Sequence, residues 1–452
     1  MNNFVIPHGL TRHAPGSVRE LLSISIPLMI ASLSGLLMNF CDRLILAHYS
    51  TDAMNAAVTA GMAANVFSYG AVEVAIIAEV FVGRYNGAQD FYKTAWPVWQ
   101  MIWFSIATAV IFLPIGIFFG PMIVSTTAFD GLSLPYFQIW MGFAFLFPLG
   151  ASLSAFFIGI GSVKIVTIAT LVSNIANVCL DYLLVFGIPN VLDPLGIHGA
   201  VIATGLAQAL QVLIFAVAFL MKNNRNRYGT HKAIFSLRLL KECLALGTPN
   251  ALGHMVEIAG WALNLRVLAA AGTDYVTVLA MGQNLHILFA FISQGLQKGV
   301  IAVGSNLMGA TAHHLLPKLI RSAFLVLGGV AAILFIPLVV KPEPIIGLFL
   351  SAAPENTQVF SMAIKTGAWV WCFIILDSIV WTMAGVLTIY GDTKFIMITN
   401  ALAAWFLAVL PMYVFLYLYH ASPYFSWVII NVYALLNACF FLIRIRRHLR
   451  FS

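Results

Sequence analysis

Arg19–Met29 reads RELLSISIPLM, and Lys241–Ala251 reads KECLALGTPNA. Each stretch begins with a basic residue and a glutamate, enters an apolar run, and reaches a proline seven residues after the glutamate. The two prolines, Pro27 and Pro249, hold the same place in their stretches, one in each half of the chain, which indicates an internal repeat. Many secondary transporters are built from two copies of a helical unit around a central site. The repeat therefore indicates transport before any single residue does.

Further elements recur at nearly the same spacing, and they extend the repeat over both halves of the chain. The copies are Arg43 and Arg266, Val82-Gly83 and Val303-Gly304, Gly87-Ala88 and Gly309-Ala310, and Gly161-Ser-Val-Lys164 and Gly391-Asp-Thr-Lys394. The most polar interior stretch, residues 222–232, has no hydrophobic periodicity and lies near the midpoint. We predict an N-terminal lobe of six helices in residues 1–224, a C-terminal lobe of six in residues 225–452, and a cytoplasmic linker where they join.

The composition indicates a membrane protein. Hydrophobic residues make up 61% of the chain and charged residues 9%, and the mean hydropathy is +0.94, whereas soluble domains carry roughly 25% charged residues. The apolar runs are long and lack the alternation of a membrane barrel, so they predict helices. We predict an all-α polytopic protein with twelve spans, near residues 20–48, 54–82, 95–120, 136–160, 165–187, 197–221, 240–270, 275–303, 316–340, 358–388, 394–419 and 424–444.

Lysine and arginine predict the orientation of these spans. With the N-terminus inside, 18 of the 23 lysines and arginines fall in inner segments, and only Lys341 and Lys365 fall in outer loops. This bias predicts that both termini are cytoplasmic. It also accounts for the net charge of +7 through a basic rim that faces anionic lipid. We therefore expect no nucleic-acid partner.

The first and fifth predicted spans carry polar residues that share a helical face. Asn39 and Asp42 lie three residues apart in the first span, and Asn174, Asn177 and Asp181 follow steps of three and four in the fifth. Carboxylate and amide oxygens suit a proton or a hard cation such as sodium. The alternative is a structural polar contact between these two helices.

The seventh and tenth spans carry a second set of polar and aromatic residues. The seventh span presents His254, Glu257, Trp261 and Asn264 on one face, and the tenth presents Asp377 and Trp381 one turn apart. Carboxylates and aromatic faces together can bind an organic cation. The alternative is that local hydrogen bonds satisfy both acids.

We expect a substrate cavity lined by Asn39, Asn174, His254, Trp261, Asn264 and Trp381 and by four further polar residues inside the spans, because a polar group within a bilayer tends to face the bundle interior. The four further residues are Glu73 in the second span and Asn284, Gln294 and Lys298 in the eighth. His286, also in the eighth span, is expected to be a packing residue rather than a proton carrier. Ser17 and Glu20 form a capping box that begins the first helix.

Several motifs are absent from the sequence. It has no P-loop, no metal-ligand cluster and no nucleophile elbow, and its five cysteines are scattered. We therefore expect neither an enzyme nor a cofactor, and the energy for transport must come from an ion gradient or a partner. A passive channel is a less favoured alternative.

The sequence resembles the multidrug and toxic compound extrusion (MATE) family, most closely its NorM-like branch. The stretch from Asn177 to Gly187, NVCLDYLLVFG, followed by Leu195–Thr204, LGIHGAVIAT, resembles the family's signature in its fifth and sixth helices. Pro27 with Asp42 fifteen residues later also fits. The resemblance extends over essentially the whole chain. It implies two pseudo-symmetric six-helix lobes that open alternately to each side of the membrane.

The resemblance also implies site residues and an activity. The family's first-lobe ion site corresponds to Asp42, Asn177 and Asp181, with Thr204 a weaker match, and the second-lobe acids correspond to Glu257 and Asp377. If sodium is the coupling ion, its carboxylate ligands are Asp42, Asp181, Glu257 and Asp377. We expect a monomeric antiporter of the cytoplasmic (inner) membrane that exports organic cations or amphipathic compounds against proton or sodium flow. The alternative within the superfamily is a lipid or lipid-linked oligosaccharide flippase.

Overall fold

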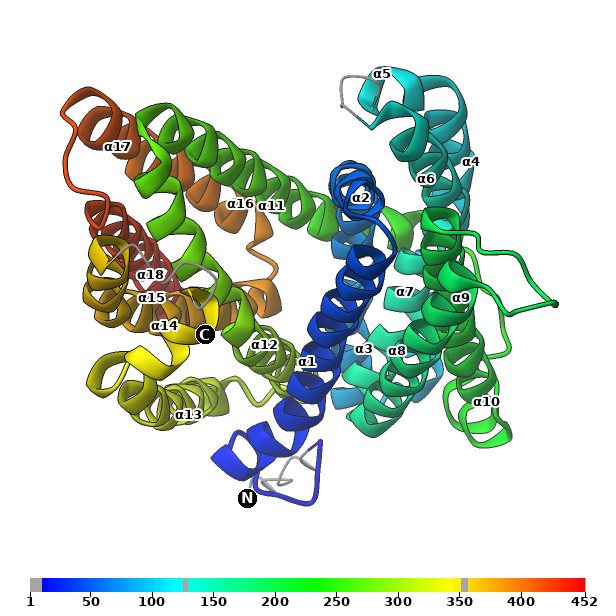
Figure 1. The fold of residues 1–452 in the computed structure, drawn as a ribbon. Helices are drawn as coiled ribbons and strands as arrows, with labels where there is room; N and C mark the ends of the chain where they lie inside the picture. The colour runs from blue at the N-terminus through cyan, green and yellow to red at the C-terminus, as the bar shows by residue number, and fades with distance from the viewer. Residues whose placement is uncertain (1–9, 125–128, 351–356, 452) are drawn as a thin grey trace. The chain divides into compact units, whose positions relative to one another are not determined.

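The computed structural model describes residues 10–124, 129–350 and 357–451, and helices dominate that part of the chain. Figure 1 follows them in order. They are α1 (Val18–Tyr49), α2 (Thr51–Ala75), α3 (Ala78–Gly87), η1 (Phe91–Lys93), α4 (Trp96–Pro114), η2 (Ile115–Phe119), α5 (Gly120–Val124), α6 (Asp130–Phe143), α7 (Leu146–Gly159), α8 (Val163–Phe186), α9 (Ile197–Phe219), α10 (Lys222–Tyr228), α11 (Leu237–Ala271), α12 (Thr273–Gly309), η3 (His313–Leu315), α13 (Leu316–Phe335), η4 (Ile336–Val340), α14 (Glu343–Leu350), α15 (Thr357–Tyr390), α16 (Thr393–Ala403), η5 (Ala404–Val409), α17 (Leu410–Met412), η6 (Tyr413–Leu418) and α18 (Phe425–Phe451). Within the described ranges the β-type pairing is a single isolated bridge between Ile188 and Leu192.

The prediction of an all-α polytopic membrane protein is confirmed. Eleven helical segments in the described residues are long and apolar enough to cross a membrane. They match every predicted span except that of residues 240–270, which lies in α11. The 35-residue α11 is long enough to cross, but polar residues such as His254, Glu257 and Asn264 lower its mean hydropathy.

The start of α1 shows one half of the predicted capping box, and the glutamate side chain caps the residue before Ser17 instead of Ser17 itself. The backbone N–H of Glu20 donates to Ser17 Oγ at 3.3 Å, and Glu20 Oε2 accepts from the backbone N–H of Gly16 at 2.7 Å. The cap satisfies N–H groups that a helix start leaves without partners. Pro27 then lies inside α1, and Pro249 lies at the corresponding point inside α11.

The described chain forms two compact units, and three helices contribute to both. Unit 1 contains residues 10–25, Leu252–Gly304 and the described residues from 312 onward, and unit 2 contains Ile26–Ala251 and Ser305–Thr311. In α1 and α11 the change of unit lies within two residues of the proline, and in α12 it follows Gly304. Lobe boundaries at 224 and 225 stay a prediction.

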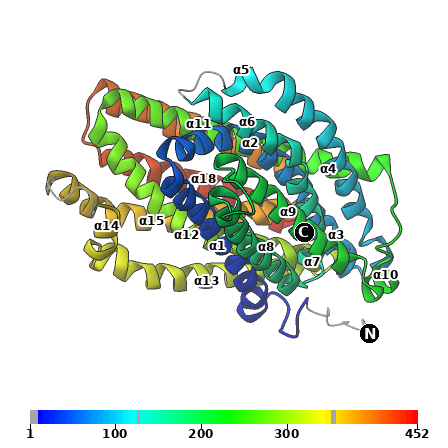
Figure 2. The same ribbon diagram turned by 45° about the vertical axis from the view of Figure 1, so that its right-hand side comes forward.

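Unit 2 is organised around α7, which packs against α2, α3, α4 and α9. The most extensive contact between two helices in this unit joins α8 to α9, and these helices lie side by side in Figures 1 and 2. A run of small residues on the buried face of α2, including Ala56, Ala60 and Ala64, lets α6 approach closely. Phe137 and Trp140 of α6 complete this core.

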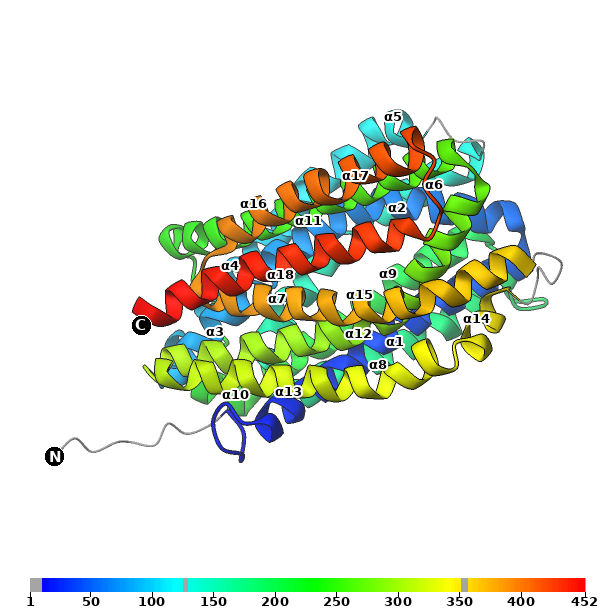
Figure 3. The same ribbon diagram turned by 90° about the vertical axis from the view of Figure 1, so that its left-hand side faces the viewer.

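Unit 1 is organised around the contact between α15 and α18. Figure 3 shows these two helices and α13 running alongside one another, and α13 packs on α15. Trp427 of α18 is fully buried in the core of this unit, and its indole N–H donates to the carbonyl of Val278 at 3.3 Å. A Cβ on Gly282 would collide with the Trp427 ring, so only glycine leaves room for it.

The two copied Gly-Ala turns pack against each other within unit 2. A Cβ on Gly87 would collide with the backbone of Asn306, and a Cβ on Gly309 would collide with the backbone of Arg84. The Asn306 side chain also accepts from Asn86 Nδ2 at 2.7 Å and donates to the Gly159 carbonyl at 2.8 Å. The end of α12 thus completes a unit made mostly from the first half of the chain.

The predicted polar linker is ordered and anchored. Residues 222–236, here called the strap, begin with the helix α10, whose Tyr228 packs edge-on against Phe91 and Phe156. The indole N–H of Trp99 donates to the Thr230 carbonyl at 3.0 Å. The fully buried Gln100 donates to the Ile234 carbonyl and accepts from the Ser236 backbone N–H. The strap is therefore part of unit 2 rather than a loose connection.

The repeat extends to irregular backbone. Pro114 ends α4 and is followed by the π-helix η2, and Pro337, at nearly the corresponding place in the second half, lies in the π-helix η4 that follows α13. Gln89 and Thr311, which are separated by the same interval as Pro27 and Pro249, both have positive φ, 59° and 55°. Matching distortions at matching places indicate that the two halves share local geometry as well as sequence.

Candidate functional site

The structure brings the predicted first-half acids together. Asp42 comes from α1 and Asp181 from α8, and their carboxyls lie within hydrogen-bond reach of each other. Asp181 and Asn177 are fully buried. Because two carboxylate oxygens both accept, the contact requires a shared proton or a bound cation between them.

The polar atoms of this group lack other partners. Asp42 Oδ1, both carboxylate oxygens of Asp181, and both Oδ1 and Nδ2 of Asn177 have no hydrogen-bond partner among the described residues. Buried polar groups without partners are costly. The four oxygens have the chemistry that a hard cation prefers, and the carboxyls have the chemistry that a proton needs. We call Asp42, Asn177 and Asp181 the first-half acid site.

The surroundings of this site differ in part from the prediction. Thr204 Oγ1 donates to the carbonyl of Ala200 in its own helix α9 at 3.1 Å, which leaves its lone pairs free to accept. Asn174 Nδ2 donates to Ser34 Oγ at 2.7 Å, so it ties α8 to α1. Asn39 is exposed one turn before Asp42. Tyr136 of α6 lies close enough to both acids to interact electrostatically, and the sequence analysis did not identify it.

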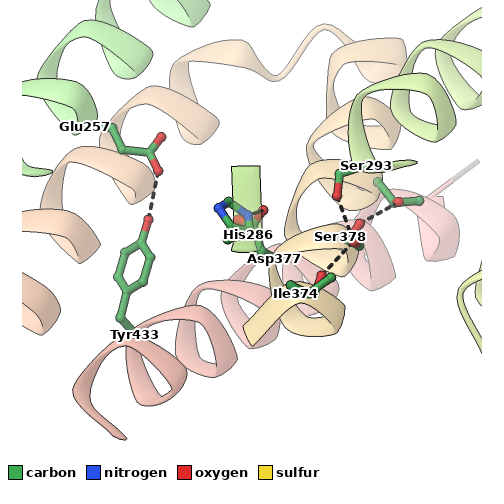
Figure 4. A network of polar contacts seen from close by, with 8 residues as sticks. Glu257, His286, Ser293, Ile374, Asp377, Ser378 and Tyr433 are labelled. Carbon is green, nitrogen blue, oxygen red and sulfur yellow. Dashed lines mark hydrogen bonds and ion pairs between the residues drawn. The ribbon is translucent and has the colours of Figure 1, made fainter. Parts of the chain in front are cut away.

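The second-half residues form a separate group within unit 1. Tyr433 Oη of α18 donates to Glu257 Oε1 at 3.1 Å, and Figure 4 shows the phenol pointing at this carboxylate. Glu257 Oε2 lies 3.6 Å from His254 Nδ1 on the same helix. His286 of α12 contacts Asp377 Oδ2 at 2.9 Å. The expectation that His286 is a packing residue rather than a proton carrier stays a prediction, and the structure adds the contact of its ring nitrogen with this acid.

Aromatic rings accompany these acids. His254 meets Trp381 edge-on with centroids 5.5 Å apart, and Trp261 meets Tyr433 edge-on at 5.8 Å. Tyr433 is near enough to both Glu257 and Asp377 to interact electrostatically. Glu257, Asp377, Tyr433 and the two histidines are here called the second-half acid site.

The remaining cavity candidates lie in different settings. Glu73 Oε2 accepts from Asn250 Nδ2 at 3.0 Å. Asn264 is buried, and its Oδ1 has no partner within the described ranges. Asn284 is exposed, while Gln294 and Lys298 are half-buried. The structure does not bring the last three into either acid site.

Asp392 forms a further polar cluster, in the turn between α15 and α16. Its Oδ2 accepts from Arg444 Nε at 2.6 Å and contacts His448 Nε2 at 2.9 Å, both from the end of α18. Burial alone would raise the pKa of Asp392, but the hydrogen bonds and positive charges of Arg444 and His448 outweigh it and hold this pKa below its usual value. The first-half copy of this turn has Ser162 instead, so this cluster belongs to the second half.

The chain matches the family model MatE over residues 27–183 and 255–414, which is more than half of its length. The chain belongs to the MatE family. Members of this family are transporters and not enzymes, and the matched segments contain Asp42, Asp181, Glu257 and Asp377.

MatE relatives are found both among sequences and among solved structures. The chain is 26% identical over 405 residues to a probable multidrug resistance protein NorM of Thermotoga maritima, covering 86% of this chain and 83% of the relative. It is 21% identical to a NorM protein of Photorhabdus laumondii over 86% of this chain and 85% of that one. An outward-facing multidrug resistance MATE transporter shares the fold, with a TM-score of 0.84 at 17% identity over 98% of this chain and 97% of that one. The predicted membership of the MATE family is therefore confirmed, and the chain is similar to NorM proteins of that family.

Proposed function

We propose that this protein is an ion-coupled antiporter that exports organic cations or other amphipathic compounds. The observation that carries the proposal is the first-half acid site, where Asp42 and Asp181 meet in a buried place with no other donors for Asp181 among the described residues. Such a pair exists stably only with a proton or cation between its members. Loss of that ion leaves two negative charges side by side. Their repulsion then favours a conformation in which the two carboxylates lie farther apart.

In the proposed cycle, ion binding and cargo binding exclude each other. The second-half acid site offers carboxylates and a phenol, the indole rings of Trp261 and Trp381 lie beside it, and this is the chemistry that recognises an organic cation. The relatives named as multidrug resistance proteins support small-molecule cargo of this kind. Protons or sodium ions are the proposed counter-ions, and sodium would be held by oxygens of Asp42, Asn177 and Asp181.

The proposed location is the cytoplasmic membrane, with both termini inside. The distribution of lysine and arginine supports this orientation, and the eleven apolar spans in the described residues support a multi-pass protein. A monomer is the proposed working form.

Export of a fluorescent organic cation from proteoliposomes tests this function. Wild-type protein is compared with Asp42→Asn and Asp181→Asn, each driven first by a proton gradient and then by a sodium gradient. The matched control is Asp52→Asn, because Asp52 is an exposed aspartate in the first turn of α2. We expect export with one gradient, lost in both site variants and retained in the control.

A second variant separates the two acid sites. If Glu257→Gln weakens binding of the organic cation but leaves export coupled to the gradient, while Asp181→Asn uncouples it, the first-half acid site binds the coupling ion. Undiminished export by Asp42→Asn would contradict the proposed mechanism. If wild-type protein exports no organic cation under either gradient, movement of a fluorescent lipid between leaflets tests the flippase alternative.

A further inference from the structure

The part of α11 that leads up to Pro249 is anchored within unit 2. The part of α11 before the bend, Leu237–Ala251, is here called the entry segment. A Cβ on Gly247 would lie 2.8 Å from the Val74 carbonyl oxygen and 3.0 Å from Val74 Cα, so the entry segment touches the backbone of α2. Three residues later, Asn250 Nδ2 donates to Glu73 Oε2 at 3.0 Å. Both contacts lie within one turn of the proline.

The strap fixes the other end of the entry segment. Gln100 accepts from the Ser236 backbone N–H, directly before α11 begins. The entry segment is thus held at its start by α4 and at its end by α2. From Leu252 onward α11 belongs to unit 1. Proline removes the hydrogen bond to the carbonyl of Ala245, so the turn that ends at Pro249 is the weakest point of the α11 backbone, just before the change of unit at Leu252.

In the first half of the chain, α1 approaches α12 as closely as α11 approaches α2, but the copy of Asn250 cannot form the side-chain hydrogen bond. Ser25 is the copy of Gly247, since the two lie equally far before Pro27 and Pro249. A Cβ on Gly299 of α12 would collide with the Ser25 side chain, within unit 1. The copy of Asn250 is Leu28, which has no side-chain donor. The repeat therefore preserves the contact between helices, and the second half alone adds a polar bond at this position.

We propose that Glu73 and Asn250 are positioning residues of the transport cycle, whose hydrogen bond holds the entry segment against α2 and so fixes the pivot of α11. In a hinge motion a few residues take up the change in backbone dihedral angles, and this hydrogen bond fixes the element on one side of those residues. In this role Glu73 acts through its acceptor oxygen and not through its charge. The inference rests on the proposed function for its cycle, but the hydrogen bond can be tested without transport.

The first test compares maximal export rate with substrate KM in proteoliposomes. Glu73→Leu and Asn250→Leu remove the bond, and the second installs the residue that the first half carries at the matching position. Glu73→Gln removes the charge but keeps an acceptor oxygen, so it is the matched control. We expect the two leucine variants to lose about fivefold or more in maximal rate, a loss typical of a coupling between two conformations. KM should stay within about twofold, Glu73→Gln should resemble wild type, and the double leucine variant should be no worse than either single one.

The second test uses a natural reporter and needs no ion gradient. Cys243 lies in the entry segment and is fully buried. In protein whose other four cysteines are replaced by serine, the rate at which a maleimide labels Cys243 reports release of the segment. We expect about fivefold or faster labelling in both leucine variants, because local opening exposes buried groups, and wild-type labelling in Glu73→Gln. Because labelling is measured in protein at rest, it remains informative even if organic cations are not the cargo.

Three results would overturn the proposal. One is a Glu73→Gln variant as impaired as Glu73→Leu, together with an unimpaired Asn250→Leu, since this outcome assigns Glu73 a charge-based contact with the cargo. Another is a raised KM with an unchanged maximal rate in Glu73→Leu, which leads to the same conclusion. The third is unchanged Cys243 labelling in both leucine variants, which shows that the entry segment stays in place without the bond.

Discussion

Replacing Gly87 with alanine should destabilise the protein through a single steric collision. Gly87 is the last residue of α3, and an added Cβ would lie 2.8 Å from the carbonyl carbon of Asn306 and 2.9 Å from its Cα, with the carbonyl oxygen closer still. Carbon atoms in contact prefer about 3.5–4.0 Å. The backbone of Asn306 would therefore have to move by ~0.7 Å or more to restore that separation. That movement also strains the Asn86–Asn306 hydrogen bond.

The expected cost follows from the nature of the colliding atoms. Overpacking in a close-packed interior typically costs about 1–3 kcal/mol, and backbone atoms cannot turn away as a side chain can. Alanine also favours helix over glycine by roughly 0.5–1 kcal/mol. Gly142→Ala is the matched control, because Gly142 lies near the end of α6 with nothing within 4 Å of an added Cβ. The difference between the two variants isolates the steric cost.

Thermal unfolding of the purified protein in detergent, followed by tryptophan fluorescence, measures this difference. At ~2–4 °C per kcal/mol, Gly87→Ala should unfold several degrees below Gly142→Ala. Gly309→Ala should behave like Gly87→Ala, since its Cβ would meet the backbone of Arg84 in the reciprocal contact. If Gly87→Ala and Gly142→Ala unfold at the same temperature, the two copied turns are not in the close contact described above.

Three further changes have defined outcomes. Tyr433→Phe removes the hydrogen bond to Glu257, and a hydrogen bond to a charged acceptor contributes ~1.5–3 kcal/mol. Export by this variant in proteoliposomes should fall about tenfold. An export rate equal to that of the wild type would contradict a role for this bond. Asp392→Asn should lower the free energy of unfolding by about 1 kcal/mol, allowing for solvent screening. Because the pKa of Asp392 is depressed in the folded state, the loss should be full above pH ~4 and vanish as pH falls through the folded pKa, and a loss that persists in acid would refute the ion pair. Gln100→Leu leaves two backbone groups of the strap without partners and should speed tryptic cleavage within residues 222–236 several-fold, whereas unchanged cleavage would show that other contacts hold the strap.

The sequence analysis identified features that depend on helical spacing and on local capping. Asp42 and Asp181 each lie on a polar helical face, and the structure brings these two acids together. The capping box needs only Ser17 and Glu20, three residues apart, and its serine half forms, while Glu20 caps Gly16. His254 and Glu257 share a face of α11, and Glu257 does lie beside an aromatic residue. In each case the information lies within a few turns of one helix.

The features that were missed depend on contacts between distant segments. Tyr433 is separated from Glu257 by 176 residues, and in a chain rich in aromatic residues it resembles any core tyrosine. His286 reaches Asp377 across 91 residues. The strap shows no hydrophobic periodicity because its order comes from Trp99 and Gln100 of another helix. A sequence pattern records the face of a helix but not the partner that the face will meet.

The low hydropathy of α11 has a consequence for how the protein is made. A segment with His254, Glu257 and Asn264 along its length is a weak signal for entry into the bilayer, since insertion depends on the summed transfer free energies of its residues. Gly272, with φ of 145°, is the one residue between α11 and α12. Unlike α11, α12 is apolar enough to cross a membrane. We expect the ribosome-bound translocon to release these two helices into lipid together, as one hairpin. The favourable transfer free energy of α12 would then offset the weak transfer free energy of α11. Membrane insertion of α11 would then wait until α12, which ends at Gly309, has been synthesised, and a chain truncated between the two helices would fail to hold α11 in the membrane.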